Sequence, residues 1–219
     1  CILSVYAGIH LLNAPTSKED TIVIKEKQQA IVKKDSNLGT VVLAGGCFWC
    51  VEHDLEESLG VVSVVSGYMG GNGENPIYEN YAERGFREVV EVTYNKDQTS
   101  FERLAFEMIY HSDPTDGAGS FYDRGQQYSP AIYYGNQEEK NIALDLISRI
   151  DKANIYDKPL AVAVLPRTFF YKAEEYHQDY SKKNSLKYSY YRNASGRDAF
   201  IKKYQSKLEL FRVQLGMAG

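Results

Sequence analysis

A short apolar run that stops at two glycines constrains the fold of this chain more than any other feature. Residues 40–44 (TVVLA) are β-branched and apolar, as in a strand that is buried on both faces. Gly45 and Gly46 interrupt this run, and residues 48–58 have the composition of a helix that Gly60 ends. Because a buried strand needs a second layer packed on it, this unit predicts helices packed on a sheet.

Further periodic segments follow along the chain. Residues 87–94 (REVVEVTY) alternate, and Glu88 lies on the more apolar face, so we expect its carboxyl group to point inward. The other segments are strands at 61–67, 131–134 and 160–165, and helices at 100–111 and 137–150, the last with Asn136 and Glu139 as a capping box. This order predicts the α+β class: a two-layer sandwich of the ferredoxin-like plait type, with a mixed sheet, helices packed on it, and irregular N- and C-terminal extensions.

The two ends of the chain differ in composition from its centre. We expect residues 1–37 to form an N-terminal extension or tether, and residues 38–219 to form one domain with a helical or loop extension at its C-terminus. Residues 2–14 are mostly apolar but too short to cross a bilayer, and the sequence does not begin with Met. They resemble the apolar remainder of a secretory signal or membrane anchor, or form a strand or helix packed on the domain. The expected location is the cell envelope or periplasm, with the cytoplasm as the alternative.

Charge and cysteine content exclude several classes of function. A net charge of -4 argues against electrostatic binding of nucleic acid. Three cysteines cannot form a disulfide scaffold in 219 residues, and Cys-x-x-Cys is half a zinc site at most. Because none of the four histidines is four residues from another, we expect no metal. We also expect the protein to be a monomer.

The segment Gly45-Gly46-Cys47-Phe48-Trp49-Cys50 has the features of a redox site. A cysteine at a glycine turn before a helix is exposed, and the helix N-terminus lowers its pKa, so Cys47 is predicted to be the nucleophile. Cys50 lies on the same side of the first turn and could form a disulfide with Cys47. Alternatives are two buried structural thiols, or a thioredoxin-like disulfide exchanger. Such exchangers usually have small residues between the thiols, whereas Phe48 and Trp49 indicate an apolar group bound at the sulfur.

At this point the sequence resembles the type A peptide methionine sulfoxide reductases. The resemblance covers roughly residues 38–180 and starts at Gly46-Cys47-Phe48-Trp49-x-x-Glu52. Six further motifs follow in the order of that family: Ser66-Gly67-Tyr68 with Gly70-Gly71; Asn75-Pro76-x-Tyr78; Glu88-Val89-Val90; His111-x-Asp113-Pro114-Thr115; Asp123-Arg124-Gly125-x-Gln127-Tyr128; and Ala173-Glu174-x-Tyr176-His177-Gln178. In the last motif we expect Glu174 and His177 to make structural hydrogen bonds.

The resemblance implies a reaction. The Cys47 thiolate attacks the sulfur of methionine sulfoxide, and Glu88, kept protonated by an apolar site, gives a proton to the oxygen. The product is methionine and a Cys47 sulfenic acid. Many family members resolve this acid with cysteines in a C-terminal extension, but this chain has none after Cys50. Cys50 is therefore the expected resolving residue, and no bound cofactor is expected, because thioredoxin or a similar external dithiol would reduce the disulfide.

The resemblance also implies the residues that hold the substrate. Phe48 and Trp49 match the aromatic wall that receives the S-methyl group. Tyr78 and Tyr128 match the hydroxyl donors that bind the sulfoxide oxygen, and Asp123 matches the carboxylate that orients them.

These matches favour one function among three. The favoured function is thioredoxin-dependent repair of oxidised methionine, as the S epimer, in proteins and as free methionine sulfoxide. The alternatives are a general thiol–disulfide oxidoreductase and a non-catalytic module that binds methionine-containing peptides through Phe48, Trp49 and the tyrosines.

Overall fold

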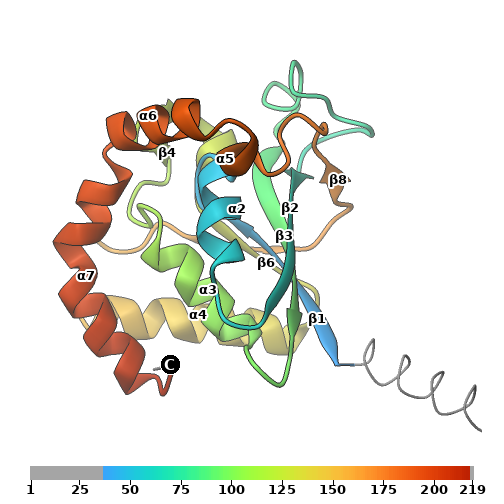
Figure 1. The fold of residues 1–219 in the computed structure, drawn as a ribbon. Coiled ribbons are helices and arrows are strands. Elements are labelled where there is room, and N and C mark those ends of the chain that lie inside the picture. Colours follow the sequence, from blue (N-terminus) through green and yellow to red (C-terminus); the bar gives the residue numbers. More distant parts are fainter. Residues whose placement is uncertain (1–36, 218–219) are drawn as a thin grey trace, which may run out of the picture. The chain divides into compact units, whose positions relative to one another are not determined.

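A mixed β-sheet forms the centre of the molecule (Figure 1). The computed structural model describes residues 37–217, so the predicted N-terminal extension lies outside the described residues. Neighbouring strands follow the order β7-β6-β1-β3-β2-β8, with β7 parallel to β6 and the other pairs antiparallel. Their bounds are β1 (Leu38–Ala44), β2 (Val61–Met69), β3 (Arg87–Asn95), β6 (Ala131–Tyr134), β7 (Ala163–Pro166) and β8 (Tyr171–Lys172). The predicted mixed sheet is thus confirmed.

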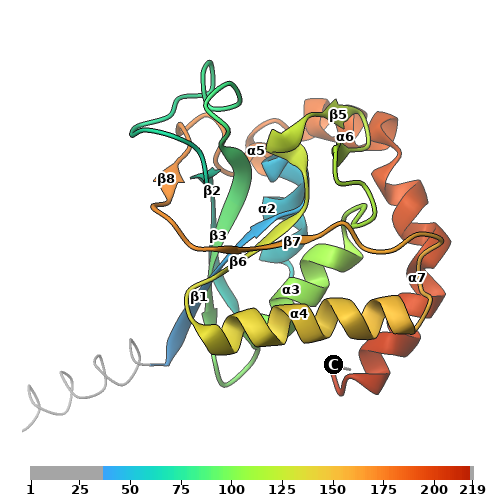
Figure 2. The ribbon, with the colours of Figure 1, turned by 180° about the vertical axis from the view of Figure 1, so that it is seen from behind.

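Helices cover one face of this sheet. They are α2 (Phe48–Glu56), α3 (Phe101–Tyr110) and α4 (Gln137–Lys152), and their apolar residues share one core with the facing side of the strands. Val41 and Leu43 of β1 point into this core, whereas Val42 and Ala44 lie in a smaller cluster on the opposite face. The prediction that this strand is buried on both faces is therefore confirmed. The segment between β7 and β8, which lie at opposite edges, crosses this second face (Figure 2).

The C-terminal part of the chain is helical, so the expected extension takes its helical form and is not irregular. It forms α5 (Tyr180–Lys183), α6 (Ser185–Ser195) and α7 (Arg197–Gln214), joined between α6 and α7 by Gly196 in the left-handed conformation. Tyr204, Leu208 and Phe211 follow helical spacing and are buried in the main core. Because polar residues, among them Lys207 and Glu209, separate these three, the apolar stripe is narrow and the bounds of this helix were not predicted.

The long polar segment between α3 and β6 is ordered. It contains a small hairpin of β4 (Gly119–Ser120) and β5 (Asp123–Arg124), followed by a single 3₁₀ turn, η1 (Gln126–Tyr128). This segment places Asp123 and Tyr128 near the start of α2. Within residues 37–217, no helix has the length and apolar character needed to cross a membrane.

Candidate active site

Cys47 and Cys50 lie at the N-terminal end of α2, where the glycine turn leaves β1. Cys47 is the N-cap residue, and its carbonyl accepts the backbone N–H groups of Cys50 and Val51. Both thiols are reduced and buried, with Cys47 6% exposed and Cys50 0%. The predicted exposure of Cys47 was wrong for this structure, because the loop between α3 and β6 and helix α6 pack over the turn.

The two thiols differ in acidity, in the direction opposite to the prediction. Burial raises the pKa of Cys47 well above its usual value, and its hydrogen bond to Cys50 acts in the same direction. A helix N-terminus stabilises an anion by at most about 2 kcal/mol, which lowers a pKa by about 1.5 units. Full burial raises the pKa of a thiol by up to about 3 to 5 units, so burial has the larger effect. The pKa of Cys50 is lowered to about 7, mainly by the hydrogen bond from Cys47. Burial of Cys50 raises this pKa, and the positive charges of Arg197 and Arg192 lower it.

Glu88 lies beside the start of α2. It projects from β3 into the main core face and is 2% exposed. Its Oε2 accepts the backbone N–H of Phe48 at 2.9 Å, and its Oε1 accepts the hydroxyl of Tyr81 at 2.8 Å. Burial raises the pKa of Glu88 to about 8, although both hydrogen bonds oppose the shift. The carboxyl group is thus a proton donor at neutral pH, hydrogen-bonded to the residue that follows Cys47.

Three tyrosines surround Glu88, and one of them was not predicted. The hydroxyl that donates to Glu88 belongs to Tyr81, which also lies 3.4 Å from the Tyr128 hydroxyl. The ring of Tyr78 stacks on Tyr81 with centroids 5.7 Å apart, and burial and the nearby Glu88 raise the pKa of Tyr78 to about 12. All three are protonated donors, but no sequence signal separates Tyr81 from the other tyrosines of its loop.

Asp123 has a partner that the sequence did not indicate. Its Oδ2 accepts a hydrogen bond from the hydroxyl of Tyr191, which comes from α6. Burial raises the pKa of Asp123 against this bond. Tyr191 also hydrogen-bonds the Cys47 sulfur, so it links the carboxylate to the nucleophile. The C-terminal helices therefore contribute to the site directly.

An aromatic cluster forms the wall beside Cys47. The Trp49 ring stacks on Tyr180 at a centroid distance of 3.7 Å, and its Nε1 donates to Nδ1 of His177 at 3.1 Å. The Phe48 ring, 1% exposed, packs 4.9 Å from the His177 ring. Burial lowers the pKa of His177, so the imidazole is neutral and orients Trp49. Glu174 similarly accepts the hydroxyl of Tyr68 and the backbone N–H of Tyr78.

The arrangement combines a dithiol, a neutral carboxylic acid and an aromatic wall. Among residues 37–217, no three His, Cys, Asp or Glu side chains are grouped so as to hold a metal ion. Acid and thiols together can reduce a polar oxygen-bearing sulfur centre: one sulfur attacks, the acid protonates the oxygen, and the second thiol closes a disulfide.

Comparison with known proteins identifies the family. The model of the family described as peptide methionine sulfoxide reductase matches residues 39–209. The chain belongs to this family. A MsrA 2 protein of Staphylococcus aureus is 42% identical over 164 residues, covering 74% of this chain and 93% of its own length. A MsrA/MsrB protein of Vibrio cholerae is 44% identical over 199 residues, or 90% of this chain; the match spans 51% of that relative, about half its length.

Solved structures of the family agree with the fold. The reduced form of Mxr1 from Saccharomyces cerevisiae superposes with a TM-score of 0.64 at 26% identity, over 68% of this chain and 87% of the other. Methionine sulfoxide reductase A of Corynebacterium diphtheriae gives 0.60 at 29% identity, over 68% and 76%. The predicted resemblance to the type A reductases is thus confirmed.

Proposed function

We propose that the protein reduces the S epimer of methionine sulfoxide, in oxidised proteins and as the free amino acid. The observation that carries the proposal is the buried, protonated Glu88, which is joined through the Phe48 N–H to the turn that bears Cys47. A carboxylic acid that is neutral at pH 7 is what the departing sulfoxide oxygen needs. Phe48 and Trp49 supply the apolar wall for the S-methyl group, and Tyr78, Tyr81 and Tyr128 supply hydroxyl donors for the oxygen.

The first step transfers oxygen from the substrate to Cys47. The Cys47 sulfur bonds to the sulfoxide sulfur as Glu88 protonates the oxygen. The hydroxyl group then passes from the substrate sulfur to the Cys47 sulfur: the S–O bond of the substrate and the transient S–S bond break as the S–O bond of the sulfenic acid forms. Methionine leaves, and Cys47 is left as a sulfenic acid. The proton that Cys47 loses replaces the one that Glu88 donates, so the step is balanced. Asp123 orients the Tyr191 hydroxyl at the Cys47 sulfur during this step.

The second step uses Cys50. Its sulfur attacks the Cys47 sulfenic acid, forms a disulfide and releases water. An external dithiol of the thioredoxin type then reduces the disulfide by exchange, and no bound cofactor takes part. The i, i+3 spacing of the two cysteines on the first turn of α2, with a hydrogen bond between the thiols, supports this role for Cys50.

A turnover experiment tests the reaction. The protein is incubated with dithiothreitol and racemic methionine sulfoxide, and both epimers are followed by chiral chromatography. We expect loss of the S epimer alone, abolished in Cys47→Ser. If neither epimer is consumed, the proposal is wrong; reduction of insulin disulfides without sulfoxide loss would favour a general disulfide oxidoreductase, and peptide binding that survives Cys47→Ser without turnover would favour a binding module.

A second variant tests the resolving residue. In Cys50→Ser, one equivalent of substrate should convert Cys47 into a sulfenic acid that accumulates and reacts with dimedone, detected by mass spectrometry. Turnover with thioredoxin, thioredoxin reductase and NADPH should stop in this variant. Unchanged thioredoxin-driven turnover would remove Cys50 from this role.

We also propose the finer features of the architecture. The antiparallel order β6-β1-β3-β2, with α2 between β1 and β2 and α3 between β3 and β6, supports a ferredoxin-like plait. Residues 38–219 are proposed to act as one catalytic domain and as a monomer. The proposed location in the cell envelope depends on residues before 37, and mass spectrometry of the native N-terminus in fractionated cells tests it.

A further inference from the structure

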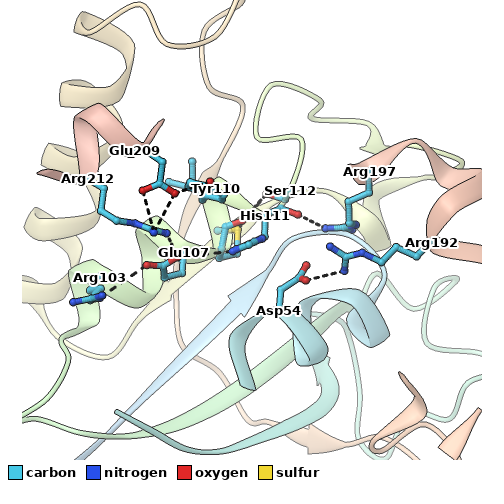
Figure 3. Close-up of polar contacts among 12 residues, drawn as sticks. Asp54, Arg103, Glu107, Tyr110, His111, Ser112, Arg192, Arg197, Glu209 and Arg212 are labelled. Atoms are coloured by element: carbon cyan, nitrogen blue, oxygen red, sulfur yellow. Dashed lines mark hydrogen bonds and ion pairs between the residues drawn. The ribbon is translucent and has the colours of Figure 1, made fainter. Parts of the chain in front are cut away.

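Arg197, at the first position of α7, carries a buried charge next to the turn that bears the thiols. Its side chain is 1% exposed. One terminal nitrogen, Nη2, donates to the Gly45 carbonyl at 3.1 Å. The other, Nη1, donates to the His111 carbonyl at 2.6 Å (Figure 3). The guanidinium also lies over the Phe121 ring, 5.0 Å from its centroid. These partners hold the side chain in place, but all of them are neutral.

Neighbouring arginines have carboxylate partners, and Arg197 does not. Arg192 pairs with Asp54 at 2.7 Å, and Arg212 pairs with Glu107 at 2.7 Å (Figure 3). Arg192 also pairs with Asp198 at 2.8 Å. Across residues 37–217, no carboxylate lies within ion-pair distance of Arg197, and its buried Nε has no hydrogen-bond partner. Since an uncompensated buried charge is costly, an anion next to this guanidinium would be stabilised.

The thiol pair is the group that can supply this anion. A Cβ built on Gly46 would lie only 2.9 Å from Nη2 of Arg197, so the guanidinium is packed directly on the turn before Cys47. Arg197 and Arg192 both favour the thiolate of Cys50, and Asp54 opposes them. The other titratable groups that face Cys50 are Cys47, Glu88, Tyr188 and Tyr191, and none of these is a cation.

We infer that Arg197 is a positioning residue that keeps Cys50 in the thiolate form, ready to attack the Cys47 sulfenic acid. The role in resolution rests on the proposed function. In that step the Cys50 sulfur forms the S–S bond with Cys47, and the S–O bond of the sulfenic acid breaks. Cys50 is oxidised and the sulfenic sulfur is reduced; the hydroxide that leaves takes the proton of Glu88, which the first step left protonated, and becomes water. Arg197 interacts more strongly with Cys50 than with Cys47, so its main effect is expected on resolution.

The first test measures the thiolate directly and needs no sulfoxide. In Cys47→Ser, which keeps a hydroxyl donor beside Cys50, the ultraviolet absorbance of the thiolate is followed against pH, and the signal of Cys47→Ser/Cys50→Ser is subtracted to remove Cys1. The Cys50 midpoint should lie below the ordinary value of about 8.5. Adding Arg197→Met should raise it by about one to three pH units, and Arg197→Lys should restore most of the shift. Arg212→Met, which removes a half-buried arginine with carboxylate partners from the same helix, should leave the Cys50 midpoint unchanged.

The second test separates resolution from sulfoxide reduction. In single-turnover experiments at pH 7 with both cysteines present, Arg197→Met should release methionine within about twofold of the wild-type rate, while disulfide formation slows by about tenfold or more. If the Cys50 midpoint of Cys47→Ser/Arg197→Met equals that of Cys47→Ser alone, the inference is overturned. If Arg197→Met does not fold, a Cys50 midpoint at or above the ordinary value in Cys47→Ser would overturn it equally. A failure of sulfoxide reduction with the expected titrations would instead count against the proposed function.

Discussion

Glu88 shows how burial prepares one side chain for acid catalysis. Its acid form is the reactive form and is lost as the pH rises through the pKa of about 8. The single-turnover rate of methionine formation should therefore be flat near neutral pH and fall above about pH 8. Glu88→Gln, which keeps the size but only one of the two acceptor oxygens, should slow this step by about 100-fold or more and remove the fall. Quenched-flow chromatography measures both, and an unaffected rate would exclude Glu88 as the acid.

Tyr81 tunes the same carboxyl group. Its hydroxyl donates to Glu88 and so lowers the pKa of that residue relative to burial alone. In Tyr81→Phe this stabilisation of the charged form is lost, so the fall in rate should move to higher pH, by up to about one unit. Tyr133→Phe is the control, because Tyr133 lies in the cluster on the other face of the sheet. Equal pH profiles for wild type and Tyr81→Phe would contradict the assignment.

The unit formed by β1, the glycine turn and α2 requires glycine for two separate reasons. Gly46 has φ +98°, and a Cβ there would lie 2.3 Å from the Ser120 hydroxyl oxygen. Gly196 has φ +84° but open space around it. We therefore expect Gly196→Ala to lower the free energy of unfolding by about 1 kcal/mol, the cost of the left-handed conformation alone, and Gly46→Ala by at least about 2 kcal/mol. Urea unfolding measures both; equal losses would show that the contact with Ser120 costs nothing.

At the scale of the whole described chain, apolar residues of the C-terminal helix α7 lie in the same core as those of the sheet. Leu208 of α7 is 0% exposed in that core, whereas Leu210, two residues on, is 62% exposed. Leu208→Ala should lower the free energy of unfolding by about 2 to 5 kcal/mol, and Leu210→Ala should change it by less than about 0.5 kcal/mol. A single urea transition that shifts in the first variant alone would show that α7 unfolds with the domain. A separate early transition would show that it does not.

The elements around the sheet were predictable because their signals are local. The strand at β1 is a contiguous apolar run, the alternation in β3 places Glu88 inward, and Asn136 accepts the Glu139 N–H at the start of α4, as the capping pattern predicts. The last predicted strand begins at Ala163 instead of residue 160. The C-terminal extension was expected to be helical or a loop, but the bounds and the packing of α7 were not predicted, because its few apolar residues form a stripe only where a core is available to bury them.

The residue types that define the site are adjacent in the sequence, whereas the charges that set the pKa values of its thiols are not. Cys47, Phe48, Trp49 and Cys50 stand together in the chain, so residue types and spacing indicated a redox pair beside an apolar aromatic surface, and the resemblance to the type A reductases implied the reaction. Which thiol is the more acidic depends on burial and on charges that arrive from far along the chain. Arg197 contacts the carbonyl of Gly45, which lies 152 residues away in the sequence, and no local sequence pattern predicts a contact over that separation. Coulomb interactions and desolvation act through space, so only the tertiary structure decided that Cys50 is the more acidic of the two thiols.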